Sequence, residues 1–566
     1  MINWTPSEGI EPTSELLDII TCDESVAVLA SAGSGKTELL AQKANYLFFT
    51  DKCAWPKRIL SLTFKTEAQI NIKERVNKRC GLKATRFDSF TFHAFCKSIV
   101  DRFKNIIPES DRPINNYDLV RRAEQANGKD KIAMGDLLVL AISILRSRDD
   151  IRTMFSSSYS NVFVDEFQDT TNEQYELLQL LFQNTDTKIL TVGDISQSIM
   201  LWAGARKTVF TDFVSDFSAQ NKYLVKNYRA SDEIQDVLSV ILQFVKGPSA
   251  TVTEITKTPG HCSLHAFSDE HQEASFIVHD INEAINSGIN PSDICVLTKQ
   301  MSSQYTEILR AALTKSGINN LDMNDLQDAL KEPLGKLFSL FLKALLCPSP
   351  KKMTELFKIN LALNKVEFGD EKEDILTTSL IKFISLKQAL ITTETSVDDL
   401  LSYTKSFIHE LSTQRIKGRW KQYKSQDYFD HIWQVLEIHL RSMCNQAKTL
   451  EDAVMLFSAE NAVHLMNVHK CKGLEYSYVY FMGLEDQAFW NYANKTFEDN
   501  CAIYVALSRA KNRICVTISR RREHRINQWH DNRASTTDDV KPVIKLLRNK
   551  CKFSITDHAK ESRGQV

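Results

Sequence analysis

The chain has 566 residues, of which 43% are hydrophobic and 25% are charged. This length is too great for a single hydrophobic core, so several subdomains are expected, and the composition excludes a largely disordered chain. The formal net charge of −1 neither favours nor excludes nucleic acid as a partner. A DNA-binding surface would therefore have to be a local basic stripe.

Two basic stretches could form such a stripe. One is the run of Arg520, Arg521, Arg522, His524 and Arg525, and the other is RIKGRWKQYK at residues 415–424. For each stretch, an ordinary solvated face explains the charges about as well as a DNA contact does.

The twelve cysteines stand singly, without a CxxC pair or a Cys/His cluster at metal-binding spacing. This pattern predicts a reducing compartment and no structural metal. No apolar stretch reaches roughly 18 residues, and the first residues lack the basic start and apolar core of a signal peptide. We therefore expect a cytoplasmic protein that has no membrane partner.

The first predicted strand, Val26–Ala30, leads into the glycine-rich segment AGSGKT, and helical spacing follows over Thr37–Phe49. The segment therefore lies at a helix N-terminus, where N–H groups and the helix dipole favour phosphate. Lys36 would reach the β- and γ-phosphates of a nucleoside triphosphate, and the Thr37 hydroxyl would bind Mg²⁺. The backbone that surrounds the phosphate oxygens would come from Ala32, Gly33, Ser34, Gly35, Lys36 and Thr37.

Further short buried strands are predicted at Arg58–Phe64, Asn161–Val164 and Ile189–Val192. The second of these stops abruptly at Asp165, with Glu166 beside it. A carboxylate at the end of a buried strand can hold Mg²⁺, directly or through water, and a second carboxylate can take a proton from attacking water. Together with the glycine-rich segment, these residues predict hydrolysis of a nucleoside triphosphate.

Strands and helical stretches alternate, which predicts an α/β fold with doubly wound parallel sheets. A second alternating block begins near Tyr223 and resumes after about Asn461. Its predicted strands are Ile294–Leu297, Tyr478–Met482 and Arg513–Ile518. The first core is predicted at residues 1–95 and 157–222, with a helical insertion at 96–156. The second core is predicted at 223–332 and 460–525, with a mainly helical insertion at 333–459 and a C-terminal tail at 526–566.

Seven more motifs follow the glycine-rich segment in a fixed order. They are LTFKTEAQINIKERV (62–76), FTFHAF (90–95), VDEFQD (164–169), VGDISQSIMLWAGA (192–205), LVKNYRAS (224–231), VHLMNVHKCKGLEY (463–476) and IYVALSRAKNR (503–513). Over nearly the whole chain, this series closely resembles the superfamily 1A helicases of the UvrD/Rep/PcrA type. The match is specific, because the motifs stand in the family's order at compatible spacings. The resemblance implies two RecA-like cores and an ATP-dependent DNA helicase of 3′-to-5′ polarity.

The resemblance also assigns catalytic roles. Asp165 would bind the metal, Glu166 would orient and deprotonate the water, and Gln197 would sense the γ-phosphate. Arg229 and Arg509 look like two arginine fingers from the second core, each worth ~10³–10⁵ in rate. The alternative for either arginine taken alone is a surface ion pair.

The remaining implied contacts concern the base, the ribose and the DNA. Tyr228 would stack on the base and Glu475 would contact the ribose. The DNA-binding candidates are Phe64, His93, Trp202 and His469, and His469 would position its motif near phosphate rather than titrate as a catalyst. Phe92 also matches a DNA position, but a place in the core is an equally good explanation. Aromatic stacking is worth about 1–3 kcal/mol per base and tolerates any sequence. The partner that the resemblance implies is single-stranded DNA or 3′-tailed duplex DNA.

Four residues depart from the family pattern. Glu15 stands where a Gln usually reads the adenine edge, and Glu38 stands where an Arg commonly covers the base. A carboxylate can accept from the adenine amino group but cannot donate to N7, so strict selectivity for ATP is not expected from the sequence. Met200 and Ala203 replace a usual Tyr and Arg near the DNA track, which predicts a weaker grip on DNA.

Three functions are compatible with these patterns. The leading one is an ATP-dependent motor on single-stranded DNA in repair or replication restart. A rival is a UvrD-like NTPase subunit that gates a partner nuclease in an anti-phage defence system, and an exposed apolar face within residues 333–459 would support it. An RNA-directed motor is the third, and it fits less well because this motif series mostly marks DNA enzymes.

Overall fold

The computed structural model describes residues 4–115, 117–120, 124, 126–224, 226–245, 260–323, 326–366, 369–522 and 534–561. The chain divides into two compact units. Unit 1 comprises Met1–Gly260, Asn491–Asn512 and Lys545–Lys552, and unit 2 comprises His261–Trp490, Arg513–Ile544 and Phe553–Val566.

Unit 1 is built on a six-stranded parallel sheet with the strand order β3-β2-β6-β7-β1-β8. The strands are β1 (Val26–Ala30), β2 (Arg58–Thr63), β3 (Phe87–Thr91), β6 (Tyr159–Val164), β7 (Lys188–Gly193) and β8 (Gln220–Leu224). Successive residues of one strand enter different cores, since Val162 and Val164 pack in one cluster and Phe163 packs in the other. Both faces of the sheet are therefore covered, as is usual for parallel sheets.

Helices form the two layers that cover this sheet. One core contains side chains of α1 (Ser14–Thr21), α2 (Lys36–Phe49) and α3 (Thr66–Cys80). The opposite core contains side chains of α4 (Phe92–Phe103), α5 (Met134–Ser147), α6 (Asp149–Ser158), α7 (Asn172–Phe182) and α8 (Val209–Asp216). In the same unit, α9 (Asp232–Val245) packs against α22 (Tyr492–Leu507), which carries residues from the end of the sequence.

The first predicted insertion contains helices and a small sheet. Between α4 and α5 lie the 3₁₀ turn η2 (Lys104–Ile106) and the parallel pair β4 (Asp118–Val120) and β5 (Lys131–Ala133). The helical pattern of this region is confirmed, but the sequence did not predict the two strands. A strand of three residues is too short to show a period of two.

Unit 2 holds a seven-stranded parallel sheet with the order β11-β12-β10-β13-β14-β9-β15. Its strands are β9 (Cys262–Phe267), β10 (Ile294–Thr298), β11 (Asn320–Asp322), β12 (Val463–Asn467), β13 (Tyr476–Met482), β14 (Ala510–Ser519) and β15 (Ser554–Asp557). One core of this unit packs α10 (Glu270–Asn286) and α12 (Glu307–Lys315) on the sheet.

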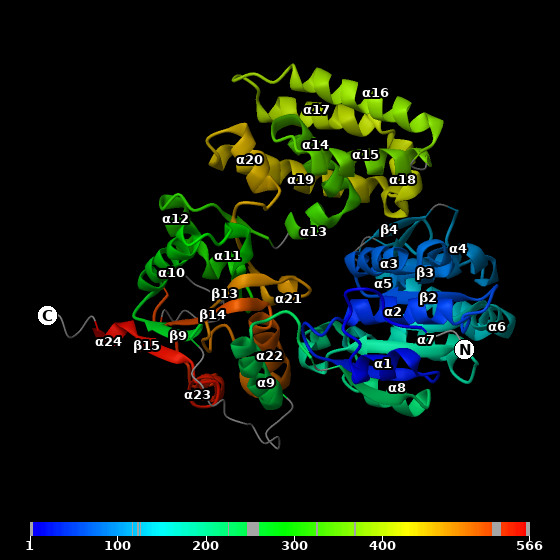
Figure 1. Cartoon of the computed structure of the whole chain (residues 1–566), viewed down its shortest axis with the longest axis horizontal. Coiled ribbons are helices and arrows are strands. Elements are labelled where there is room, and N and C mark those ends of the chain that lie inside the picture. The colour runs from blue at the N-terminus through cyan, green and yellow to red at the C-terminus, as the bar shows by residue number, and fades with distance from the viewer. Residues whose placement is uncertain are drawn as a thin grey trace. The chain divides into compact units, whose positions relative to one another are not determined.

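A helical body interrupts unit 2 between β11 and β12 (Figure 1). It consists of α14 (Pro333–Leu346), α15 (Pro350–Asn364), α16 (Glu371–Gln388), α17 (Val397–Glu410), α18 (Thr413–Arg419), α19 (Gln426–Gln446) and α20 (Leu450–Phe457). Helix α14 lies at its centre, where the rings of Phe341 and Phe407 stack with centroids 4.2 Å apart. The predicted α/β fold with two parallel sheets and mainly helical insertions is confirmed.

The predicted strands all occur, most of them extended by one to three residues. Tyr223, near which the second alternating block was expected to begin, lies in β8, and β8 pairs with β1 at the edge of the unit 1 sheet. The residue boundaries of the predicted domains stay a prediction.

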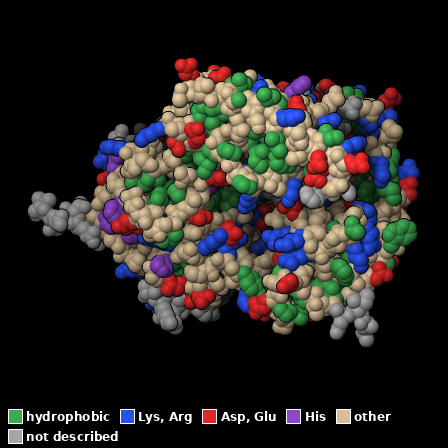
Figure 2. All heavy atoms as spheres, turned by 45° about the horizontal axis from the view of Figure 1, so that its top comes forward, with side chains coloured by type: hydrophobic (Ala, Val, Ile, Leu, Met, Phe, Trp, Pro, Cys, Tyr) green, Lys and Arg blue, Asp and Glu red, His purple; other side chains and the backbone are tan. Residues whose placement is uncertain are grey.

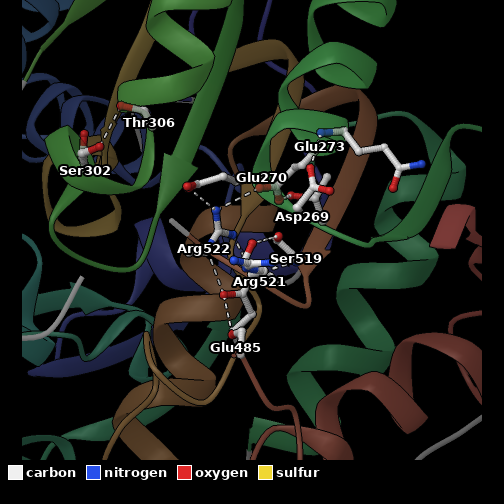
Figure 3. Close-up of polar contacts among 12 residues, drawn as sticks. Asp269, Glu270, Glu273, Ser302, Thr306, Glu485, Ser519, Arg521 and Arg522 are labelled. Atoms are coloured by element: carbon white, nitrogen blue, oxygen red, sulfur yellow. Dashed lines mark hydrogen bonds and ion pairs between the residues drawn. The ribbon is translucent and has the colours of Figure 1, made fainter. Parts of the chain in front are cut away.

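The surface drawn in Figure 2 carries acidic and basic side chains close to one another. The predicted basic stripe around Arg520 is wrong for Arg522, which is 1% exposed and lies among Glu270, Glu273 and Glu485 (Figure 3). Arg520 pairs with Asp557 at the surface, and His524 and Arg525 lie outside the described residues. In the second stretch, the side chains of Lys421 and Lys424 are likewise outside the described part. No helix in the described ranges is long and apolar enough to cross a membrane.

Candidate nucleotide site and nucleic-acid residues

The predicted phosphate loop, Ala32–Thr37, lies at the junction between β1 and α2. Gly35 precedes the first helical residue with φ +84°, and no side chain caps this end of the helix. A Cβ on Gly35 would meet no atom within 4 Å, so open space lies beside the helix N-terminus. The N–H groups and the positive end of the helix dipole are therefore presented to an anion.

Gly33 has a different role in the loop. Its φ is +72°, and a Cβ there would lie 2.3 Å from Asn227 Oδ1 and 2.9 Å from Arg229 Cβ. Asn227 Oδ1 accepts a hydrogen bond from the Arg229 N–H at 2.7 Å, and the Tyr228 N–H donates to the Gly33 carbonyl at 3.0 Å. Only glycine lets the segment that carries Tyr228 and Arg229 approach the loop this closely.

The Lys36 ammonium lies against the loop itself. It donates to the Ser31 carbonyl at 3.1 Å and to the Ala30 carbonyl at 3.5 Å. Ser34 donates its hydroxyl to the same Ser31 carbonyl at 2.8 Å. The cation predicted to reach the phosphates is thus held at the end of β1, where the loop begins.

The two predicted carboxylates follow β6 directly. Asp165 is 6% exposed, and Glu166 adopts the left-handed conformation with φ +51° and ψ +44°. A non-glycine residue adopts this conformation rarely, and such strain concentrates at functional sites. Gln168 donates to Glu166 Oε2 at 2.7 Å and accepts from the Asp194 N–H at 2.9 Å. Gln168 therefore orients Glu166, a role that the sequence did not predict although Gln168 lies within VDEFQD.

A line of polar side chains continues from Gln168 to the other predicted catalytic groups. Gly193 allows the Gln168 side chain to pack closely against the backbone, because a Cβ on residue 193 would lie 2.3 Å from Gln168 Oε1. Asp194 accepts from Gln197 Nε2 at 2.7 Å, and Gln197 Oε1 accepts from Arg509 Nη2 at 3.4 Å. Hydrogen bonds thus connect Glu166 to Arg509 through Gln168, Asp194 and Gln197. Asp194, like Gln168, was not singled out from the sequence.

Both predicted arginine fingers lie in unit 1. Arg509 is 2% exposed and donates to the Val505 carbonyl at 3.0 Å and to the Ser508 hydroxyl at 2.8 Å. Arg229 lies within 3.5 Å of the Ser508 carbonyl. A surface ion pair is therefore excluded as the role of Arg509, because its side chain is buried.

The residues predicted near the base lie on both units. Tyr228 is 55% exposed, and the Lys226 ammonium lies 5.1 Å from its ring centroid. Glu38 forms ion pairs with Arg79 at 2.9 Å and Arg75 at 3.1 Å, so it fastens α3 to α2. Although burial raises the pKa of Glu38, hydrogen bonds from Gln42 and the arginines hold it below its usual range. Glu15 is exposed on α1, and Glu475 is exposed in unit 2.

The predicted DNA-binding residues differ in exposure. Trp202 is 64% exposed in the 3₁₀ turn η6 (Leu201–Ala203), whereas Phe64 and His93 are partly buried. Burial lowers the pKa of His93. Phe92 is 2% exposed inside the core of unit 1, so the core explanation holds for it. His469 lies in α21 (Val468–Cys471) of unit 2, directly after β12.

The chain's oxygen donors fit Mg²⁺. Thr37 offers a hydroxyl and Asp165 a carboxylate, and Mg²⁺ prefers such ligands. Within the described ranges, no group of three or more His, Cys, Asp or Glu residues could hold a metal by itself.

Comparison with known proteins agrees with this geometry. The profile of the UvrD/REP helicase N-terminal domain matches residues 13–126 and 107–218, and that of the UvrD-like helicase C-terminal domain matches residues 222–521. The chain belongs to the UvrD-like helicase family. The matched ranges contain every residue of the polar line from Glu166 to Arg509.

Individual relatives of this UvrD-like chain are distant in sequence, but the similarity extends over most of both chains. A "Probable DNA helicase II homolog" of Mycoplasma capricolum is 23% identical over 89% of this chain and 83% of its own length. A "Putative ATP-dependent DNA helicase YjcD" of Bacillus subtilis is 22% identical over 89% of this chain and 78% of its own. An "ATP-dependent DNA helicase PcrA" of Staphylococcus aureus is 21% identical over 88% and 81%, respectively.

Proposed function

We propose that this UvrD-like chain hydrolyses ATP to move along single-stranded DNA with 3′-to-5′ polarity. The observation that carries the proposal is the hydrogen-bonded line from Glu166 to Arg509 beside the phosphate loop. It connects a carboxylate suited to activate water with an arginine suited to stabilise charge on a transferred phosphoryl group. DNA repair or replication restart is the proposed setting, in the cytoplasm.

Each residue of the site has a proposed task. The N–H groups of Ala32–Thr37 and the Lys36 ammonium hold the phosphates, and Tyr228 and Glu475 contact the base and the ribose. Thr37 and Asp165 would hold Mg²⁺, which would supply positive charge to the phosphate oxygens. Glu166 takes the proton of the attacking water, and Gln168 keeps the carboxylate aimed. Gln197, Arg229 and Arg509 then stabilise the negative charge that shifts during phosphoryl transfer.

The proposed DNA track includes the exposed ring of Trp202, together with Phe64, His93 and His469. An exposed aromatic face offers stacking to any base, which suits a motor that must tolerate every sequence. The names of the relatives as DNA helicases support DNA over RNA, and the polarity comes from the family resemblance alone. The proposed substrate is single-stranded DNA or 3′-tailed duplex DNA. The predicted domain boundaries belong to the same proposal. In it, the first core ends at residue 222 of the sequence and the second core begins at residue 223.

The proposal is tested by ATP hydrolysis with and without single-stranded DNA. We expect stimulation by roughly tenfold or more, and complete loss of hydrolysis in Glu166→Gln, which keeps the shape of the side chain but cannot accept the proton. Glu176→Gln is the matched control, because Glu176 pairs with Arg146 at the surface of α7. An equal rate of ATP hydrolysis with and without DNA would refute the proposal that the chain alone is a DNA motor. Repeating the assay with GTP measures how far Glu15 and Glu38 relax the choice of base.

A second candidate function is an NTPase subunit that gates a partner nuclease in anti-phage defence. The observation that favours it is a set of exposed apolar side chains in the helical insertion. Ile375 and Leu386 of α16 are each 69% exposed, Ile381 is 44% exposed, and Leu390 just beyond the helix is 53% exposed. Such side chains suit a protein partner. Under this function, hydrolysis would respond to DNA only after a partner nuclease is added, and Leu386→Lys would abolish the response.

A further inference from the structure

Two loops of unit 1 lie at the amino ends of β2 and β3. One joins α2 to β2, and the other is the 3₁₀ turn η1 (Gly81–Arg86), which joins α3 to β3. With the residues that flank them, they form what we call the paired-loop surface, residues 49–58 and 78–88. The sheet is parallel, so the predicted nucleotide residues, which follow β1, β6 and β7, lie at its opposite edge. The six residues of β2 separate the two edges by about 20 Å.

Hydrogen bonds hold the two loops together. Arg86 of the second loop donates to the carbonyls of Cys53 and Lys57 in the first, at 2.8 and 3.3 Å. Lys83 donates to the Phe48 carbonyl at the end of α2, at 2.9 Å. The two loops therefore form one surface that is ordered before a ligand binds, which lowers the entropic cost of binding.

Three large apolar side chains are exposed on the paired-loop surface. Leu82 is 90% exposed, Trp55 is 82% exposed and Phe49 is 43% exposed. Trp55 lies in a turn that is closed by the Lys57 N–H, which donates to the Ala54 carbonyl at 2.9 Å. Single exposed apolar residues are common, but a group of them on adjacent, ordered loops is typical of a protein-binding surface. Tryptophan in particular is enriched among the residues that dominate binding energy.

Positive charge predominates on the same surface. It contains seven Lys and Arg residues, two Asp residues and no Glu, although the whole chain carries a net charge of −1. Three of the cations have a carboxylate partner, in the pairs Arg58–Asp88, Lys52–Asp23 and Arg79–Glu38. Four have no ion-pair partner among the residues that the structure describes: Lys57, Lys78, Lys83 and Arg86. Complementarity of charge therefore favours an acidic ligand.

The positive charge adjoins the apolar side chains directly. The Lys83 ammonium lies 4.4 Å from the ring centroid of Phe49, and Lys83 follows Leu82 in the chain. Phosphates of a nucleic acid would also be attracted to the cations, but the Leu82 and Phe49 side chains offer them no hydrogen bond. A protein segment can supply both carboxylates and an apolar side chain, so it fits the whole surface.

We propose that the paired-loop surface binds an acidic segment of a partner protein that carries at least one large apolar side chain. This side chain packs against Trp55 and Leu82, and carboxylates of the segment lie near the Lys57 and Lys83 ammonium groups. The partner attaches at the edge of the sheet opposite the predicted nucleotide site, so it does not block hydrolysis. This interaction goes beyond the proposed function.

The first experiment selects ligands from a display library of random peptides of about twelve residues, on the immobilised full-length chain at low salt. We expect the enriched peptides to contain an excess of Asp and Glu and at least one Phe, Trp or Leu. The double variant Trp55→Ser, Leu82→Ser should not enrich them. A selection that enriches no acidic peptide, or that enriches the same peptides on the double variant, would overturn the proposal.

The second experiment measures the Kd of the most enriched peptide by fluorescence anisotropy. Trp55→Ser and Leu82→Ser should each raise the Kd at least about tenfold. Lys57→Glu should raise it about three- to tenfold, and less at high salt. Val139→Ser and Lys129→Glu are the matched controls, because Val139 is 59% exposed on α5 and Lys129 is exposed in the first insertion. Equal effects in the controls would contradict the proposal. All five side chains lie at the surface or partly exposed, so the Tm should stay near that of the parent chain.

Two results would identify a different occupant and overturn the proposal. One is displacement of the peptide by a single-stranded oligonucleotide, with weaker DNA binding in Leu82→Ser, which would indicate a nucleic-acid contact. The other is a dimer of the parent chain that Trp55→Ser dissociates, which would indicate a second copy of the chain. The proposed function is tested separately, because peptide binding needs neither ATP nor DNA. We expect ATP hydrolysis and its stimulation by DNA to be unchanged in Trp55→Ser.

Discussion

The two units place opposite chemistry at the first strand–helix junction of their sheets. In unit 1, β1 leads through a glycine-rich loop into α2, whose N-terminus has no side-chain cap. In unit 2, β9 leads into α10, where the Asp269 side chain caps the helix by accepting from the Gln272 N–H. Two carboxylates of the first turn, Glu270 and Glu273, are both 0% exposed. One helix dipole is left for a ligand, and the other is satisfied by the chain itself.

The unit 2 junction is completed by Arg522. Its guanidinium lies 3.0 Å from Glu273, 2.6 Å from Glu485 and 3.8 Å from Glu270, and 4.9 Å from the ring centroid of Tyr305 (Figure 3). Three buried carboxylates share one buried cation, and burial raises the pKa of Glu273. A parallel sheet therefore does not by itself create a nucleotide site. The residues of the strand–helix junction decide whether it binds phosphate or stabilises the fold.

Among changes at the two junctions, Arg522→Met is expected to have the largest effect, which is a loss of folding stability. Removing the cation leaves buried carboxylates unpaired, which costs about 3–5 kcal/mol of unfolding free energy. Thermal unfolding should show a fall in Tm of several degrees. Arg520→Met is the control, since Arg520 pairs with Asp557 at the surface and such a pair is worth at most about 1 kcal/mol. Equal losses in the two variants would contradict the structural role of Arg522.

The matching change in unit 1 is Lys36→Ala. It removes the charge that stabilises the transferred phosphates, so steady-state ATP hydrolysis should fall at least about a hundredfold. The Tm should stay near that of the parent chain, because the change removes only hydrogen bonds from Lys36 to the Ala30 and Ser31 carbonyls, and such bonds are worth about 0.5–1.5 kcal/mol each. Lys222→Ala is the control on the same sheet, where Lys222 pairs with Asp18. A large loss of Tm in Lys36→Ala would mean that the two junctions do not differ as proposed.

The pH dependence of folding stability, measured for the parent chain and for Glu273→Gln, tests the unit 2 junction separately. A carboxyl group whose pKa is raised in the folded state binds its proton more tightly there than in the unfolded chain. Its contribution to stability is complete below the ordinary pKa of 4.5 and is lost as the pH rises through the raised value. Urea unfolding of the parent chain should show this decline, and Glu273→Gln should flatten it. Glu283→Gln, on the exposed part of α10, should leave the slope unchanged.

The smallest effect is expected from His265, which stands in β9 beside His558. Burial, together with His558, lowers the pKa of His265 to about 4. The unfolded chain then binds more protons than the folded one between pH 6.5 and 4, so stability falls as the pH drops through this range. His265→Phe should reduce the fall, whereas His279→Phe, at an exposed position of α10, should not. A parent chain whose stability is flat over this range would refute the prediction.

The sequence alone determined the elements whose signals are local. The buried run Val26–Ala30, the glycine spacing before Lys36 and the helical period after it predict β1, the phosphate loop and α2, because each depends on residues close in the chain. The same holds for the long helical insertion at 333–459. The strands β4 and β5 were missed because three residues carry too little pattern to be recognised.

Only the tertiary structure decided which side chains act together. Gln197 and Arg509 are 312 residues apart, and Gln168 accepts from the N–H of Asp194, which lies 26 residues further along the chain. No local sequence pattern encodes these two hydrogen bonds. Arg522 looked like part of a basic surface, yet it is buried against Glu273 of the first turn of α10 and Glu485 of the segment after β13. Sequence periodicity reports whether a residue faces a core, but the identity of its partner depends on how the strands are ordered in the sheet.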